Sequence, residues 1–147
     1  MHEVEIKIIN TSGNQLPDYA TTGSAGLDLK ANLELPVVLQ PFERAMIPTG
    51  IFIEIPYGFE AQVRPRSGLA IKHGITCLNS PGTVDSDYRG ELKVILINLS
   101  GQEYTINNGE RIAQMVISKV ERACWLPVIE LQSSVRGEGG FGHTGIL

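Results

Sequence analysis

Short apolar runs alternate with turn residues along most of the chain. Eight such runs are rich in Val, Ile and Leu and are separated by Gly, Pro, Asn or Ser: residues 4–9, 27–33, 51–55, 59–63, 75–78, 91–99, 103–106 and 126–131. Runs of this kind, bounded by turn residues, predict β-strands. The pattern therefore favours an all-β sandwich or barrel of antiparallel strands over alternating βαβ units.

Two stretches carry information beyond the simple alternation. Residues 110–126 contain neither Gly nor Pro, and their apolar positions also fit helical spacing, so the period alone does not decide between helix and strand. The β-branched residues in this stretch favour a strand. Residues 92–97 are apolar on both alternations after Lys93, which predicts a strand buried on both faces. Either a subunit interface or a central core position would explain the second buried face.

Composition and charge narrow the picture further. The 16 glycines and 8 prolines make up about one residue in six of the 147, which argues against long helices, and the length fits one domain. The net charge of −4 excludes the broad basic field of a protein that binds a nucleic-acid polymer, but a small anionic ligand remains possible. There is no basic, apolar leader and no long apolar run, so we expect a soluble, cytoplasmic protein with no membrane partner. Cys77 and Cys124 have no zinc-site spacing.

Glycine-containing segments with polar centres recur along the chain. None of them matches a P-loop or a dinucleotide-binding fingerprint. Glycine lets backbone N–H groups approach an anion, and arginine offers a planar fork for two phosphate oxygens, so loops of this kind can bind phosphate. Each segment taken singly is more typical of turn residues and solvated charges. The five segments are Ser24-Ala-Gly-Leu-Asp-Leu29, Arg64-Pro-Arg-Ser-Gly-Leu-Ala70, Pro81-Gly-Thr-Val-Asp-Ser-Asp-Tyr-Arg-Gly90, Gly109-Glu-Arg-Ile-Ala-Gln114 and Arg136-Gly-Glu-Gly-Gly-Phe-Gly-His-Thr-Gly145.

The C-terminal segment is unusual among these. Five of the 16 glycines fall in the last eleven residues and surround a single aromatic residue, Phe141. Taken alone, the segment is typical of a disordered end. However, Arg136, Phe141 and Thr144 give it a charge, a stacking face and a hydroxyl, which a plain linker lacks.

Together and in this order, the five segments closely resemble the five motifs of the trimeric dUTP diphosphatases (dUTPases). The resemblance implies a jelly-roll-like β-sandwich over residues 1–135, with residues 136–147 as a flexible C-terminal lid of the same domain. It also implies a homotrimer with active sites at subunit interfaces. The implied reaction is hydrolysis of dUTP to dUMP and pyrophosphate with Mg²⁺, which keeps uracil out of DNA and supplies dUMP for thymidylate synthesis.

The resemblance also implies a role for individual residues. Asp85 is the expected general base, which activates the water that attacks the α-phosphorus. Asp28 is expected near Mg²⁺, in contact through water rather than directly. The implied substrate-binding residues are Arg66, Ser67, Gly68, Asn79, Thr83, Val84, Asp85, Tyr88, Lys93, Gln114, Arg136, Phe141, Gly142 and Thr144, although Lys93 occupies a variable place in the family.

Within that set, the resemblance divides the substrate between segments. Arg66, Ser67, Gly68 and Gln114 are expected to meet the phosphates, and the hairpin at residues 79–85 is expected to bind uracil. Tyr88 is expected to pack against the deoxyribose and leave no room for a 2′-hydroxyl. In the lid, Phe141 would stack on uracil, while Arg136 and Thr144 would hold the γ-phosphate.

Two alternatives remain open at this point. A dCTP deaminase, or a bifunctional relative, shares the fold, but Asp85-Ser-Asp-Tyr88 and the Phe-containing tail look like the hydrolase. A non-catalytic trimeric β-sandwich that binds a nucleotide or a protein needs neither a water-activating carboxylate nor a closing lid. Ammonia release from dCTP, or binding of dUTP without turnover, would identify these alternatives.

Overall fold

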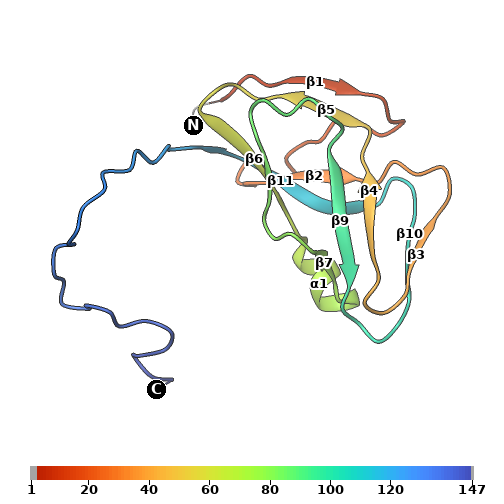
Figure 1. The fold of residues 1–147 in the computed structure, drawn as a ribbon. Helices are drawn as coiled ribbons and strands as arrows, with labels where there is room; N and C mark the ends of the chain where they lie inside the picture. Colours follow the sequence, from red (N-terminus) through yellow and green to blue (C-terminus); the bar gives the residue numbers. More distant parts are fainter. Residues whose placement is uncertain (1–2, 147) are drawn as a thin grey trace.

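The computed structural model describes residues 3–146 and is built almost entirely of β-strands (Figure 1). The long run of short strands predicted from the alternation is therefore confirmed. The strands are β1 (Lys7–Asn10), β2 (Leu27–Lys30), β3 (Val37–Leu39), β4 (Arg44–Pro48), β5 (Ile51–Glu54), β6 (Phe59–Arg64), β7 (Ile75–Cys77), β8 (Gly82–Val84), β9 (Lys93–Asn98), β10 (Tyr104–Ile106) and β11 (Arg111–Lys119), with one helix, α1 (Ser67–His73).

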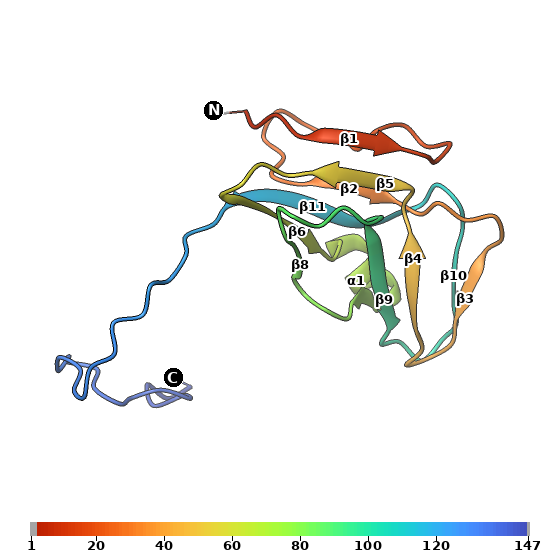
Figure 2. The same cartoon turned by 45° about the horizontal axis from the view of Figure 1, so that its top comes forward.

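The strands form small antiparallel sheets that enclose one core. The largest sheet has the order β2-β11-β6-β8, and a second has the order β4-β9-β7; β1 pairs with β5 and β3 with β10. In Figure 2, β5, β2 and β11 run across the molecule, while β4, β9, β3 and β10 run steeply to them. Apolar side chains from these groups of strands meet in one buried cluster that includes Leu29, Leu39, Val94 and Ile112. The all-β, jelly-roll-like sandwich is thus the fold of this chain.

The ambiguous stretch at residues 110–126 contains the central strand of the largest sheet. β11 pairs with β2 on one side and with β6 on the other. Ala113 and Met115 are buried, and the half-buried Gln114 between them lies on the opposite face of the sheet. Both edges of this strand are paired with neighbouring strands. The β-branched residues therefore indicated the correct element, a strand, and the helical spacing of the apolar residues did not.

The strand predicted to be buried on both faces is β9. Leu92, Val94 and Leu96 are at most 2% exposed and face the core. On the other face, Ile95 and Ile97 are half-buried in the single chain. The core face is therefore confirmed, and a subunit interface over Ile95 and Ile97 stays a prediction.

The prediction of a strand at residues 126–131 is wrong within this chain. The segment is extended, but it has no neighbouring strand to pair with, and it leaves the body of the molecule (Figure 1). Trp125, Leu126 and Ile129 are 85%, 84% and 108% exposed. A β-type sequence becomes a strand only where a partner accepts its backbone hydrogen bonds.

Several short elements were not predicted. β3 and β4 lie in a stretch that contains Pro36, Pro41 and Pro48. Proline was interpreted there as a turn residue between strands. Helix α1 ends at Gly74, whose φ of 64° is the left-handed C-cap conformation and whose N–H bonds the Ala70 carbonyl. At seven residues α1 is the longest helix of residues 3–146, and none there has the length and apolarity to cross a membrane.

Candidate active site

Strand pairing brings three of the five segments together at one end of the largest sheet. Asp28 on β2 lies opposite Gln114 on β11, and Gln114 lies opposite Arg64 on β6. The chain after β6 then places Arg66 beside Asp28, with its Nε 3.1 Å from Oδ1. On the other side, Arg111 Nη1 is 3.6 Å from Asp28 Oδ2. One carboxylate between two guanidinium groups leaves a net positive charge at this place.

A polar pocket of about 280 Å³ lies beside this group of charges. Gln114 Nε2 donates to the Pro65 carbonyl at 3.1 Å, and its side chain covers Gly26 so closely that a Cβ there would be 2.6 Å from Oε1. Glycine at position 26 therefore lets the Gln114 amide reach the pocket wall. The lining residues are Ala20, Ser24, Ala25, Gly26, Asp28, Arg66, Ser67, Gly68 and Gln114.

The third segment forms a different pocket of about 400 Å³. Its wall is the edge strand β8, which pairs with β6 on one side, so alternate backbone groups of Thr83 and Val84 face the open edge. Asn79, before β8, lies against Gly82, where an added Cβ would be 3.0 Å from Nδ2. The lining residues are Met46, Val63, Thr83, Val84, Asp85, Tyr88, Glu91, Leu92, Lys93 and Ile95.

Asp85 connects this pocket to a second, wider hollow. The hollow measures about 790 Å³ and is lined by Thr83, Asp85 and Asp87 together with residues 57–60 and 120–122. Asp85 itself is exposed, directly after β8. A water molecule can therefore reach its carboxylate from either side.

The polar pocket and the β8 pocket share no lining residue. On β6, Val84 is opposite Ala61, whereas Gln114 is opposite Arg64. Three residues of strand, about 10 Å, separate these positions. A single chain thus carries the predicted phosphate-binding and nucleoside-binding residues as two separate halves.

The predicted lid residues lie far from both pockets in this chain. Residues 121–146 extend away from the body and fold back on themselves near the end (Figures 1 and 2). Phe141 is fully exposed, and Arg136 Nε donates to the Gly139 carbonyl at 2.5 Å within the tail itself. Arg136, Phe141, Gly142 and Thr144 are therefore not brought to a site by their own chain.

Comparisons with known proteins identify the family of this chain. The dUTPase family model matches residues 4–145. The chain belongs to the dUTPase family. The deoxyuridine 5'-triphosphate nucleotidohydrolase of Fusobacterium nucleatum subsp. nucleatum is 58% identical over 145 residues, covering 99% of each chain. That of Cytophaga hutchinsonii is 59% identical over 140 residues, 95% of this chain and 91% of the relative. A solved dUTPase of Staphylococcus bacteriophage 80alpha with dUPNHPP is 27% identical, with a TM-score of 0.86 over 97% of this chain and 99% of that one.

Two charged residues in or next to the segments were not predicted to have a role. Arg111 lies inside the fourth segment, and its guanidinium is 3.6 Å from the Asp28 carboxylate. Glu91 directly follows the third segment and lines the β8 pocket. The charge of each residue, inside or directly after a segment, was the available signal.

A metal held by the protein alone does not fit the described residues. Residues 3–146 contain no group of three or more His, Cys, Asp or Glu side chains that could hold an ion. Both carboxylate oxygens of Asp28 face guanidinium groups. The donor set fits Mg²⁺ only as an ion that arrives on substrate phosphates and keeps several waters, one of which can reach Asp28.

Proposed function

We propose that this chain hydrolyses dUTP to dUMP and pyrophosphate. The observation that carries the proposal is the pair of pockets built from the dUTPase motif residues, one cationic and one with an open strand edge. The high identity to curated deoxyuridine 5'-triphosphate nucleotidohydrolases supports the same reaction. On this proposal the partner is a small nucleotide, with no nucleic-acid polymer and no membrane, and the enzyme works in the cytoplasm.

The polar pocket is the proposed phosphate half of the site. Arg66, Ser67, Gly68 and Gln114 line it and supply guanidinium, hydroxyl, backbone and amide donors. Asp28 holds Arg66 in place through the 3.1 Å ion pair. Because the reaction must offset several negative charges before water approaches phosphorus, positioned donors of this kind supply much of the catalysis.

Magnesium is the proposed cofactor. Bound to the phosphates, Mg²⁺ neutralises their charge, with Asp28 placed to hydrogen-bond one of its waters. The net positive charge left by Arg66 and Arg111 beside Asp28 acts on the same phosphate oxygens.

The β8 pocket is the proposed nucleoside half. The free backbone groups of Thr83 and Val84 can pair with the uracil edge, and Asn79 Nδ2 and Oδ1 lie at the start of the same hairpin. Tyr88 presents its ring to the sugar, and a close ring excludes a 2′-hydroxyl by contact. Lys93 is a basic residue in the wall of this pocket, and its side chain is 41% exposed.

Asp85 is the proposed general base. An ionised carboxylate can accept a proton from water, and its position between the β8 pocket and the large hollow leaves it accessible to a water molecule. The water then attacks the α-phosphorus in line with the leaving pyrophosphate. Positioned base catalysis contributes about 10²–10⁴-fold.

The two separate halves support a homotrimer with active sites at subunit interfaces. A phosphate half of one chain then meets the nucleoside half of a neighbour. Residues 136–147 are proposed as a lid that closes on another chain's site, because residues 136–146 lie away from the strands of their own chain (Figure 1). In it Phe141 stacks on uracil, Arg136 and Thr144 bind the γ-phosphate, and Gly142 with a φ of 90° permits the turn.

Product analysis over dUTP, dCTP, dTTP and UTP, with and without Mg²⁺, tests the proposal. We expect Mg²⁺-dependent pyrophosphate and dUMP from dUTP and almost no product from the other nucleotides. Asp85→Asn should still bind dUTP while kcat falls by at least about 10²-fold. Ammonia release from dCTP, or tight binding of dUTP without hydrolysis by the unmodified protein, contradicts the proposal.

A further inference from the structure

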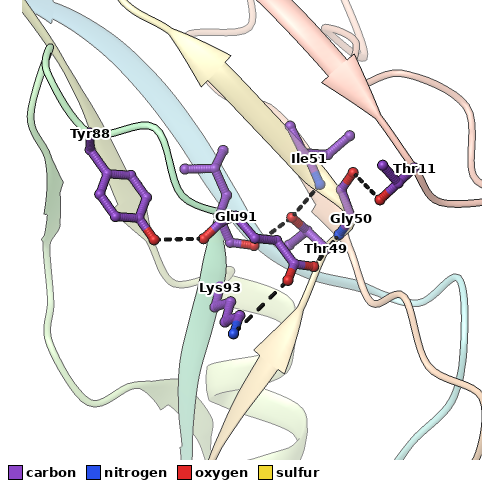
Figure 3. A network of polar contacts seen from close by, with 8 residues as sticks. Thr11, Thr49, Gly50, Ile51, Tyr88, Glu91 and Lys93 are labelled. Atoms are coloured by element: carbon purple, nitrogen blue, oxygen red, sulfur yellow. Dashed lines mark hydrogen bonds and ion pairs between the residues drawn. The ribbon is translucent and has the colours of Figure 1, made fainter.

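Tyr88 is held at a fixed place by the residue three positions after it. Its hydroxyl donates to the backbone carbonyl of Glu91 at 3.0 Å (Figure 3). Within the described residues, the other hydrogen bonds of residues 85–90 stay inside their own loop, from Tyr88 N to the Asp85 carbonyl and from Arg89 to the Ser86 and Tyr88 carbonyls. The position of the Tyr88 ring therefore depends on where Glu91 is held.

The Glu91 side chain fixes that position. Its Oε1 accepts the Gly50 N–H at 2.8 Å, and Oε2 lies 4.0 Å from Lys93 Nζ. The hydrogen bond to Gly50 is shorter than the ion pair with Lys93. It is also better protected from water, because the Glu91 side chain is 22% exposed and the Lys93 side chain is 41% exposed. Glu91 thus links two parts of the chain. Its backbone carbonyl bonds Tyr88, and its carboxylate bonds the turn between β4 and β5.

The β4–β5 turn is itself held in place by several hydrogen bonds. Gly50 has a φ of 70°, and its carbonyl accepts both the backbone N–H and the hydroxyl of Thr11, at 2.8 and 3.1 Å. Buried Thr49 donates its hydroxyl to the Leu92 carbonyl at 2.6 Å, and the Leu92 N–H bonds the Ile51 carbonyl at 2.8 Å. Figure 3 shows a series of polar contacts from Thr11, just after β1, through Gly50 and Glu91 to Tyr88. Glu91 is consequently held by a part of the core.

Gly90 leaves the space that the ring occupies. A Cβ at this position would lie 2.4 Å from the Tyr88 hydroxyl oxygen and 2.6 Å from Cζ. These are distances at which the ring must shift. Glycine at position 90 and the Glu91 carbonyl therefore determine the same ring position independently.

We propose that Glu91 and Gly90 are positioning residues that set the discrimination between deoxyribose and ribose. The inference rests on the proposed function, in which Tyr88 packs against the sugar. The two sugars differ by one hydroxyl oxygen, so a ring displaced by about 1 Å changes whether that oxygen fits. Replacement of Glu91 or Gly90 reduces the discrimination against UTP more than it reduces the turnover of dUTP.

The decisive measurement is the ratio of kcat/KM for dUTP to that for UTP. Glu91→Ala removes the acceptor of the Gly50 N–H and should lower this ratio about tenfold, the effect expected for one lost hydrogen bond. Glu91→Gln keeps an acceptor oxygen and should stay within about twofold of the unmodified protein. Glu54→Ala is the matched control, because Glu54 pairs with Lys7 at 3.1 Å on the exposed side of β5. Its ratio should not change.

Gly90→Ala tests the same idea without removing a hydrogen-bonding group. It should also lower the ratio about tenfold, whereas Gly101→Ala, with open space around the added Cβ, should not. An unchanged ratio in Glu91→Ala or in Gly90→Ala overturns the inference, and so does a Glu91→Gln ratio as low as that of Glu91→Ala.

A readout that needs no turnover separates this inference from the proposed function. The aromatic NMR signals of Tyr88 in the free protein should move in Glu91→Ala and Gly90→Ala and stay in place in the two controls. If the unmodified protein fails to hydrolyse dUTP, the proposed function falls, and the Tyr88 signals still decide whether Glu91 and Gly90 position the ring.

Discussion

Thr49 offers a stability test whose size follows from the structure. Its side chain is 1% exposed; the hydroxyl donates to the Leu92 carbonyl at 2.6 Å and accepts the Ile51 N–H at 3.2 Å. Thr49→Val keeps the shape but leaves both backbone groups without this partner. An unsatisfied buried group costs about 1–3 kcal/mol, so the two together predict a loss of about 2–6 kcal/mol in the free energy of unfolding. For a chain of this length, that corresponds to a Tm lowered by about 4–24 °C.

Urea denaturation and thermal melts, at one fixed protein concentration, provide the assay. Thr49→Ser keeps the hydroxyl and removes one methyl group, so it should cost only about 1 kcal/mol. Thr105→Val, on the exposed side of β10, should change the free energy of unfolding by less than about 0.5 kcal/mol. A Thr49→Val loss below about 1 kcal/mol, or a Thr49→Ser loss of the same size as that of Thr49→Val, would refute the reasoning.

Three further outcomes are expected. Deletion of residues 136–147 should leave the free energy of unfolding within about 0.5 kcal/mol, because the tail does not pack on its own body, while kcat/KM for dUTP falls at least tenfold. Gly26→Ala should weaken dUTP binding about tenfold, measured by titration, because the added Cβ displaces the Gln114 amide. Burial raises the pKa of the Cys77 thiol from 9.0 to about 11, so between pH 9 and 11 the unfolded chain loses a proton that the folded chain keeps. Stability should fall as the pH rises through this window, by at most about 2–3 kcal/mol, and Cys77→Ala should remove this part of the slope.

Each of these three predictions would be contradicted by a specific result. A tail deletion that unfolds the protein would mean that the tail is structural. A Gly26→Ala protein with normal dUTP affinity would mean that the Gln114 amide does not meet the substrate. An equal slope of stability against pH in Cys77→Ala and in the unmodified protein, from pH 9 to 11, would place the titration on another group.

Much of the fold was accessible from the sequence because its signals are local. The turn residues between short apolar runs located β5, β6 and β9, and the β-branched side chains identified β11. Helix α1 was missed because Gly68 lies in its first turn, although Gly74 at its end was visible as a C-cap signal. Residues 126–131 have the composition of a strand, but pairing is a property of a neighbour and is not encoded in the segment itself.

The site was predictable to a smaller extent than the fold. The motifs predicted Asp28, Arg66 and Gln114 for one site. The strand register and the chain after β6 bring these three residues together, and their roles stay predictions. The contact between Arg111 and Asp28 depends on the bulge near the start of β11, which shifts the register between Arg111 and Ala113. Likewise, the link from Glu91 to Gly50 joins positions 41 residues apart and follows from tertiary packing.

The separation of the two pockets has a consequence for mixtures of defective chains. In the proposed trimer, a chain with Arg66→Ala lacks a working phosphate half but still offers its nucleoside half to a neighbour. A chain with Asp85→Asn does the reverse. Trimers assembled from both kinds of chain regain about a quarter of their sites at equal random mixing, since the phosphate half and the nucleoside half of each site come from two different subunits. Two alleles that are each inactive can therefore complement one another in the same cell.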